Sequence, residues 1–181
     1  MSEETDGELL GRALGGDAAA FRALYFRHRD AVFRFSFRLL GTESLAEDVT
    51  HDCFLSLLRR GGSFDERRAS LRTYLCAAAR NLGLKQLRRR GVDVDLEAAE
   101  PESLAERSNG PLETLLSREE TARVAEAVGR LPPLQREAIV LFEYEEMSLA
   151  EIAEIAGCDP GTVSARLHRA RTRLRRMLGE P

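Results

Sequence analysis

Residues 148–178, SLAEIAEIAGCDPGTVSARLHRARTRLRRML, restrict the fold more than any other stretch because they carry start and stop signals for two consecutive helices. Ser148 begins a Ser-x-x-Glu capping box, which opens a helix. Gly157 is suited to end that helix, Asp159 can cap the next one, and Pro160 fits its first position. A short helix, a glycine turn and a second helix form the pattern of a helix-turn-helix.

The second helix of this motif is strongly basic, although the whole chain has a formal net charge of −3. Residues 162–178 contain six arginines, one histidine and no acidic residue. At about 100° per residue the apolar side chains gather in one arc, so the polar ones occupy the opposite face and its flanks. The apolar arc comprises Val163, Leu167, Ala170, Leu174, Met177 and Leu178.

A basic second helix distinguishes a DNA reader from a helical hairpin of purely structural use, since such a helix lies in the major groove and contacts bases through its first two turns. The expected base readers are Ser164, Ala165, His168 and Arg169. Arg169 suits guanine best because its guanidinium can donate to O6 and N7 together. Flanking arginines are better placed for phosphates, which give affinity and register without sequence information. They are Arg166, Arg171 and Arg173.

Helical periodicity dominates the rest of the chain and no convincing alternating strand is present, which predicts an all-α fold. Glycines and caps divide this pattern into expected helices at residues 7–15, 17–41, 43–60, 68–90, 113–129, 132–145 and 148–156, followed by the basic helix. The expected core stripe of the long second helix is Phe21, Leu24, Tyr25, Val32, Phe33, Ser36, Phe37 and Leu40.

Charge is segregated along the chain. Residues 67–90 contain eight basic and no acidic residues, whereas residues 92–107 contain six acids and one arginine. The acidic segment is also rich in Pro, Gly, Ser and Asn, which is typical of a linker. We therefore expect two small helical domains, residues 1–91 and 113–181, joined by an acidic linker at residues 92–112.

Several functional classes are disfavoured by the sequence. The acidic N-terminus lacks the basic and apolar pattern of a signal peptide, and no apolar run approaches the roughly 20 residues of a membrane span, so a cytoplasmic protein without membrane insertion is expected. The three cysteines are widely spaced and predict neither disulfides nor a metal site. No clustered carboxylates, nucleophile-base pair or phosphate-binding glycine loop indicates an enzyme, and no cofactor is expected.

Two stretches give the chain a resemblance to a known family. LPPLQREAIVLFEYEEMSLAEIAEIAGCDPGTVSARLHRARTRLRRML is similar to region 4 of the sigma-70 family, and AEDVTHDCFLSLLRR with FDERRASLRTYLCAAARNLGLKQLRRR resembles region 2. The short chain, in which no region 3 domain separates the two, resembles the extracytoplasmic function (ECF) group. The resemblance covers roughly residues 10 to 178.

This resemblance implies a sigma factor that binds core RNA polymerase and directs promoter recognition, with an anti-sigma factor as a further partner. The implied polymerase-docking residues, spaced to share one helix face, are Asp48, His51, Asp52 and Leu55. The implied residues for melting and reading the minus-10 element of promoter DNA are Phe64, Tyr74, Arg80, Asn81, Lys85 and Arg88. The basic helix would read the minus-35 element. The acids of the linker that could mimic phosphates in polymerase channels are Asp93, Asp95, Glu97, Glu100 and Glu102.

Two other classes remain as alternatives. An autonomous dimeric helix-turn-helix regulator would explain residues 148–178, but it has no use for a second basic block and would need a dimer interface that the sequence does not reveal. A nucleic-acid enzyme would explain the basic patches, but lacks the clustered carboxylates that such chemistry requires. The pairing of both sigma-like regions in this order favours the sigma factor.

Overall fold

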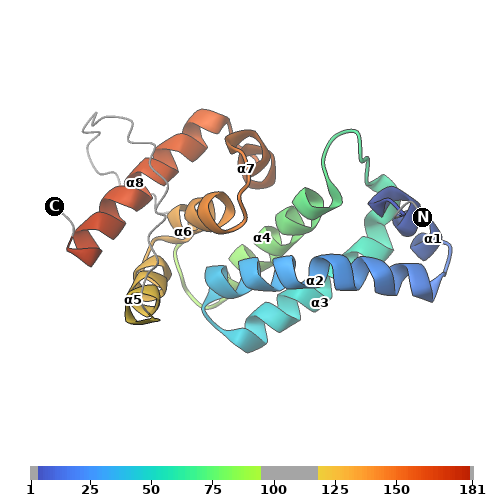
Figure 1. Ribbon diagram of the computed structural model, residues 1–181, viewed down its shortest axis with the longest axis horizontal. Coiled ribbons are helices and arrows are strands. Elements are labelled where there is room, and N and C mark those ends of the chain that lie inside the picture. The colour runs from blue at the N-terminus through green and yellow to red at the C-terminus, as the bar shows by residue number, and fades with distance from the viewer. Residues whose placement is uncertain (1–3, 95–117, 180–181) are drawn as a thin grey trace.

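The computed structural model describes residues 4–94 and 118–179, and every regular element within them is helical (Figure 1). This confirms the expected all-α class. The N-terminal group consists of α1 (Asp6–Leu14), α2 (Ala18–Leu40), α3 (Glu43–Arg60), the 3-10 turn η1 (Gly61–Ser63) and α4 (Leu71–Arg89). The C-terminal group consists of α5 (Arg118–Gly129), α6 (Pro133–Ile139), the π-helical turn η2 (Val140–Tyr144), α7 (Leu149–Ala156) and α8 (Pro160–Leu178).

The N-terminal group is a bundle in which α2, α3 and α4 pack on one another and α1 packs on α2. Its centre is formed by fully buried side chains such as Phe35, Leu57 and Leu75. The helices α2 and α4 approach closely at Gly83, where an added Cβ would lie 2.9 Å from Leu39 Cδ2. Glycine at this position therefore sets the distance between the two longest helices of the bundle.

The first helix is tied to the bundle by charged groups. The carboxylate of Asp6 accepts a hydrogen bond from Arg27 at 2.6 Å, and its other oxygen lies 2.8 Å from Nε2 of the buried His28. Apolar contacts of Leu9 and Leu10, both buried, complete the attachment. α1 is thus an integral part of this domain.

The C-terminal group surrounds a second set of buried apolar side chains. Leu131, Leu141, Ile152 and Val163 are each almost fully buried, and they come from the turn before α6, from η2, from α7 and from α8. The chain also packs one group on the other: α7 contacts α4, while α5, α6 and η2 contact α2 (Figure 1). The two helical domains are therefore in contact in this structure.

Four sequence expectations about the fold were wrong in detail, two of them in the N-terminal group. In α2 the predicted core residue Phe37 is 44% exposed, whereas Phe35 and Leu39, absent from the predicted stripe, are fully buried. The reason is that α2 is covered by several elements at once, which shifts its buried face along the helix. The expected helix at 68–90 begins only at Leu71 because the Ser70 side chain caps it.

The other two differences lie in the C-terminal group. The expected single helix at 132–145 ends as an α-helix at Ile139 and continues as the π turn η2, in which Glu145 N–H donates to Val140 C=O at 3.1 Å. At the end of α8, Met177 is 39% exposed, although the periodicity placed it in the buried arc. Leu174 and Leu178 of the predicted arc are half-buried, so the arc is less covered toward the end of α8 than at Val163, Leu167 and Ala170.

Candidate nucleic-acid interface

The helix-turn-helix forms at α7 and α8 through the caps that the sequence predicts. Ser148 and Glu151 make the reciprocal capping box of α7. Gly157 ends α7 in the left-handed conformation, with φ of 64°, which favours glycine. Asp159 then caps α8 by accepting from Thr162 N–H at 3.0 Å. A hydrogen bond from the Thr162 hydroxyl at 2.7 Å, together with this one from its N–H, holds the pKa of Asp159 below its usual value.

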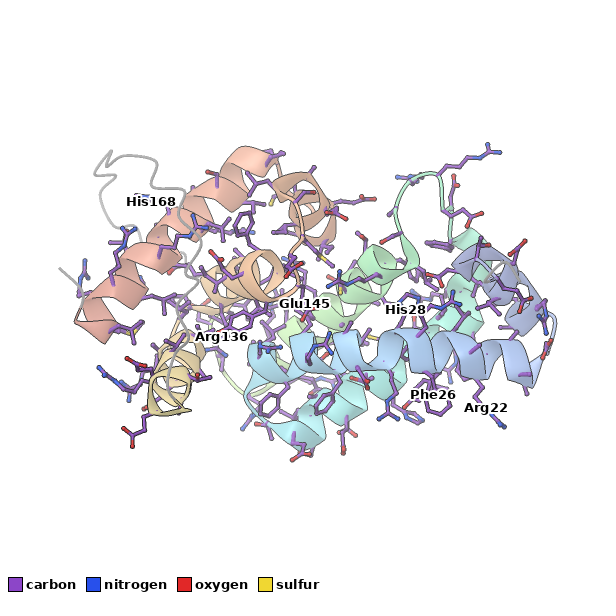
Figure 2. All side chains as sticks on the ribbon, viewed as in Figure 1. Arg22, Phe26, His28, Arg136, Glu145 and His168 are labelled. Atoms are coloured by element: carbon purple, nitrogen blue, oxygen red, sulfur yellow. The ribbon has the colours of Figure 1, made fainter. Side chains whose placement is uncertain are left out.

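The face of α8 opposite its buried arc carries the predicted base readers. Val163, Leu167 and Ala170 anchor the helix, and the reader positions lie on the other side. Ser164 and His168 are exposed, while Ala165 and Arg169 are half-buried; Figure 2 labels His168 on this helix. The helix is thus held in the core on one side and carries the reader positions on the other, which is the arrangement that a groove-binding helix requires.

The predicted phosphate-contacting arginines of α8 are half-buried. Arg171 donates to a carboxylate oxygen of Glu143 at 2.7 Å, and its guanidinium lies 5.2 Å from the centre of the Phe142 ring. Arg166 donates to Cys158 Sγ at 3.8 Å. Arg173 is half-buried as well. Arg171 would have to leave Glu143 before it could neutralise a phosphate.

The predicted minus-10 residues lie on α4 and the loop before it. The rings of Phe64 and Tyr74 meet edge to face with centroids 5.5 Å apart, so the structure brings these two aromatic candidates together. Asn81, Lys85 and Arg88 are exposed and follow one another at spacings of four and three along one face of α4. Phe64 also lines an open pocket of about 500 Å³ whose other walls are Asp6, Arg27, Glu66, Ser70 and Leu71.

Arg80 is placed differently from the other minus-10 candidates. Its side chain is only 14% exposed and its Nε lies 2.9 Å from Oε1 of Glu137, on α6 of the other domain. Its Nη1 also donates to the side-chain oxygen of neighbouring Asn81 at 3.3 Å. In this structure a candidate DNA-contacting cation is therefore engaged by an acid of the C-terminal group.

The predicted polymerase-docking residues share one face of α3, and all four are exposed. The opposite side of the helix is buried through Val49, Cys53, Phe54 and Leu57. Leu55 is 39% exposed and lies beside the acids, which gives the face an apolar element. An acidic and partly apolar surface on one helix suits a partner that presents basic and apolar side chains.

Other exposed apolar side chains on α2 were not predicted. Phe26 is 61% exposed and points outward beside Arg22 in Figure 2. The ring of Phe37 stacks on that of Phe33, with the ring centroids 6.1 Å apart. The sequence could have indicated this exposure, because a helix with more phenylalanines than one buried stripe can hold must expose some of them.

Within residues 4–94 and 118–179, no group of His, Cys, Asp and Glu has the arrangement of a metal site, and no helix has the length and apolarity of a membrane span.

Comparison with known proteins relates these surfaces to one family. A family model described as Sigma-70 region 2 matches residues 24–92, and one described as Sigma-70, region 4 matches residues 121–174. The ECF RNA polymerase sigma factor SigW of Bacillus subtilis is 33% identical over 171 residues, which cover 90% of this chain and 91% of SigW. The chain belongs to the ECF group of sigma-70 factors.

Two further similarities agree with this membership. The sigma factor BldN of Streptomyces coelicolor is 32% identical over 171 residues, and the match spans 94% of this chain but 65% of BldN. The solved structure of the sigma factor RpoE with the anti-sigma factor NepR from Bartonella quintana superposes with a TM-score of 0.67 at 29% identity, covering 88% of this chain and 96% of that one. As an alternative sigma factor, the chain has core RNA polymerase and promoter DNA as partners.

In this sigma factor, charged side chains connect regions 2 and 4. Arg136 of α6 donates to the Leu39 C=O at the end of α2 at 2.7 Å and to Leu131 C=O at 3.0 Å (Figure 2). Burial lowers the pKa of Arg136. Glu145, after η2, is fully buried among arginines of α2 and α4.

Sequence reasoning did not identify these contacts. The sequence signal was weak: the stretch EAIVLFEYEEM is largely apolar but holds four glutamates, of which the structure buries Glu137 and Glu145. Acids in such a stretch are buried only when they are paired, so they could have been flagged as requiring cationic partners. Their partners lie dozens of residues away, and the sequence does not name them.

Proposed function

We propose that the two sigma regions divide promoter recognition between the domains. Residues 1–91 form the polymerase-docking and minus-10 domain, residues 113–181 form the minus-35 domain, and residues 92–112 form the linker. One observation carries this proposal: three accessible surfaces of different character, on α3, α4 and α8, occur in one chain. An autonomous regulator would use only the last of them.

For the minus-35 element, we infer that base contacts come from Ser164, Ala165, His168 and Arg169. They lie on the face of α8 opposite its buried arc, with Ser164 and His168 exposed and Ala165 and Arg169 half-buried, and this placement supports the inference. The arginines at Arg166, Arg171 and Arg173 would contact phosphates, which position the helix without specifying sequence. Arg171 is 33% exposed and its present partner Glu143 is 37% exposed, so exchanging this ion pair for a phosphate costs little.

For the minus-10 element, the proposed surface combines stacking and charge. Opened bases need aromatic platforms and cations near the backbone. Phe64 and Tyr74 provide adjoining rings, while Asn81, Lys85 and Arg88 provide an exposed polar and basic row on α4. Arg80 belongs to the same surface once it is released from Glu137.

For polymerase docking, the proposed residues are Asp48, His51, Asp52 and Leu55 on α3. Their exposure and common face support this role, because an interface of this kind places a small apolar patch inside a polar rim. Charged residues at an interface also steer association and choose the partner. This surface should dock on a basic face of the polymerase.

The linker is proposed to reach between the two promoter elements. Of its acids, Asp93 is described and exposed, whereas Asp95, Glu97, Glu100 and Glu102 lie outside the described residues. A free coil of this length spans about 25 Å. Promoter elements one to two helical turns apart are separated by roughly 35 to 70 Å. The linker must therefore be stretched, and we infer that polymerase does this by threading the acidic segment through its basic channels.

The remaining proposals concern the setting of the protein. An anti-sigma factor is proposed as a further partner because the superposing RpoE structure contains one. We also propose a cytoplasmic location and a non-enzymatic role, in which polymerase performs the chemistry. These proposals follow from the family, whose members are transcription initiation factors.

Footprinting with and without core polymerase tests the proposed division of labour. A module that neutralises only a few phosphates binds weakly, so the free protein should not protect promoter duplex at physiological salt. With core polymerase, both elements should be protected together. A tight, specific footprint by a dimer without polymerase would instead establish an autonomous regulator.

A further inference from the structure

Region 4 places two buried glutamates against arginines of region 2. Glu145 and Glu137 each have side chains only 1% exposed. The facing cations come from two helices of the other domain: Arg34 and Arg38 on α2, and Arg72 and Arg80 on α4. We call these four residues the arginine face. Charges are buried in proteins only when they are paired, so each domain depends on the other for its charge balance at this contact.

Glu145 is the centre of this contact. Arg72 donates to its carboxylate at 2.8 Å and to its backbone C=O at 2.8 Å. Arg34 and Arg38 lie at 4.0 and 3.9 Å from the same carboxylate, and the Arg38 guanidinium also lies 4.3 Å from the centre of the Tyr144 ring. The geometry imitates a phosphate held by several arginines, since Arg is suited to anions with several acceptor oxygens.

The contact at Glu137 involves a residue already proposed to bind DNA. Arg80 lies 2.9 Å from this carboxylate, in the middle of the α4 surface that also carries Asn81 and Lys85. Burial raises the pKa of Glu137, an effect that the nearby charge of Arg80 opposes. Arg80 cannot contact a phosphate of DNA while it neutralises Glu137.

We call the contact of these two glutamates with the arginine face the lock. The lock leaves some hydrogen-bond acceptors unsatisfied, which favours exchange of the glutamates for another anion. Among the described residues, Glu145 Oε1 and Glu137 Oε2 are buried without a hydrogen-bond partner. A buried carboxylate oxygen that lacks a donor loses the hydration it would have in water. Four arginines face these two carboxylates. Arg166 also interacts electrostatically with Glu137, and Glu151 with Arg72, so positive charge remains in excess and a polyanion can satisfy it more fully. Three of the four remain 30% exposed or more, and thus within reach of such a ligand.

We propose that the arginine face binds the phosphates of single-stranded promoter DNA, and that Glu137 and Glu145 occupy it as internal phosphate substitutes in the free protein. This inference rests on the proposed function, in which α4 meets the opened minus-10 strand. It adds Arg34, Arg38 and Arg72 to the DNA-binding surface. It also makes region 4 a built-in competitor of DNA, because the two domains must separate before both promoter elements can be reached.

The test measures binding of a fluorescent single-stranded oligodeoxynucleotide to the full-length free protein by anisotropy. The double variant Glu137→Gln, Glu145→Gln removes both substitutes with little change of shape. The double variant Glu146→Gln, Glu154→Gln is the matched control, because it removes the same charge from exposed positions of the same domain. If the lock is closed in more than about 90% of the free molecules, it lowers their apparent affinity for DNA at least about tenfold. The Glu137→Gln, Glu145→Gln variant should therefore bind the oligodeoxynucleotide at least about tenfold more tightly than the control.

Two further readouts connect this gain to opening and to the arginine face. Small-angle X-ray scattering should show a larger radius of gyration for the Glu137→Gln, Glu145→Gln variant than for its control. Adding Arg34→Gln and Arg38→Gln should abolish the gain in DNA binding, whereas adding Arg22→Gln and Arg59→Gln, on exposed positions of α2 and α3, should not. Each phosphate that an arginine no longer neutralises should also reduce the salt slope by about 0.7.

Hydrogen exchange of the wild-type protein tests the lock without any substitution that could destabilise the fold. On addition of the oligodeoxynucleotide, hydrogen exchange should become faster in residues 133–147 and slower in residues 71–89. Equal DNA binding by the two glutamine variants, or no change of exchange in residues 133–147, would overturn the lock. Run-off transcription by the wild-type holoenzyme tests the proposed function separately from the lock. If transcription depends on this protein while the DNA-binding and exchange tests fail, the proposed function holds and the lock is wrong.

Discussion

Removing the acids of α3 should uncouple this sigma factor from polymerase without unfolding it. Asp48 and Asp52 are exposed one helical turn apart, and the buried side of α3 is apolar. Exposed substitutions of this kind change the free energy of unfolding by about 0.5 kcal/mol or less. In contrast, losing one partner of a hydrogen-bonded charge pair that docking buries costs about 2 to 5 kcal/mol, and we expect polymerase to bury both acids. Asp48→Ala, Asp52→Ala should therefore weaken binding to core polymerase by about 30-fold or more.

The matched control is Glu43→Ala, Glu47→Ala, which removes the same charge from another face of the same helix. Glu43 lies in the first turn of α3, where an acid stabilises the helix by about 0.3 to 1 kcal/mol. The control should thus be slightly less stable than the test variant and still bind. Binding is measured by pull-down and titration with core polymerase, and folding by circular dichroism. Full binding by Asp48→Ala, Asp52→Ala, or equal loss in the control, would refute this docking face.

Three other predictions concern the DNA contacts, the linker and the thiols. Arg169→Ala should cost about 1 to 3 kcal/mol at one minus-35 base pair in promoter competition assays, whereas Arg173→Ala should weaken all promoters alike; an equal loss on scrambled sites would reduce Arg169 to a phosphate contact. Replacing residues 93–106 with a neutral Gly-Ser chain should weaken polymerase binding or alter abortive RNA synthesis, and unchanged values would leave a passive tether. Burial raises the pKa of the Cys53 and Cys76 thiols to about 12. In the native protein a thiol reagent should therefore modify only the half-buried Cys158, and in denaturant it should modify all three cysteines. Reaction of Cys53 or Cys76 in the native protein would contradict their burial.

The elements that the sequence predicts best are those determined by local chemistry. The ends of α7 and the start of α8 follow from Ser148, Gly157, Asp159 and Pro160, because caps and turns act over three or four residues. The buried arc of α8 is also correct through Ala170, since a helix with one covered side has one apolar face. The common, exposed face of the α3 acids followed from spacing in the same way.

What the sequence does not predict is determined by distant parts of the chain. Phe37 is exposed and Phe35 buried because α2 contacts both its own bundle and region 4, so more than one side of it is covered. The engagement of Arg80 by Glu137 joins residues 57 positions apart, and periodicity carries no information about such a pair. Arg80 was predicted as a DNA contact from the family alone, and its present partner depends on how the two domains meet.

Run-off transcription with purified core polymerase over a library of promoter sequences tests the central claim most directly. We expect added protein to make core polymerase initiate on a subset of the library that shares two elements one to two helical turns apart. Sequence preference at the distal element should change in Arg169→Ala, and all transcription should fall in Asp48→Ala, Asp52→Ala. Transcripts that do not depend on the added protein, or that share no sequence element, would contradict the account.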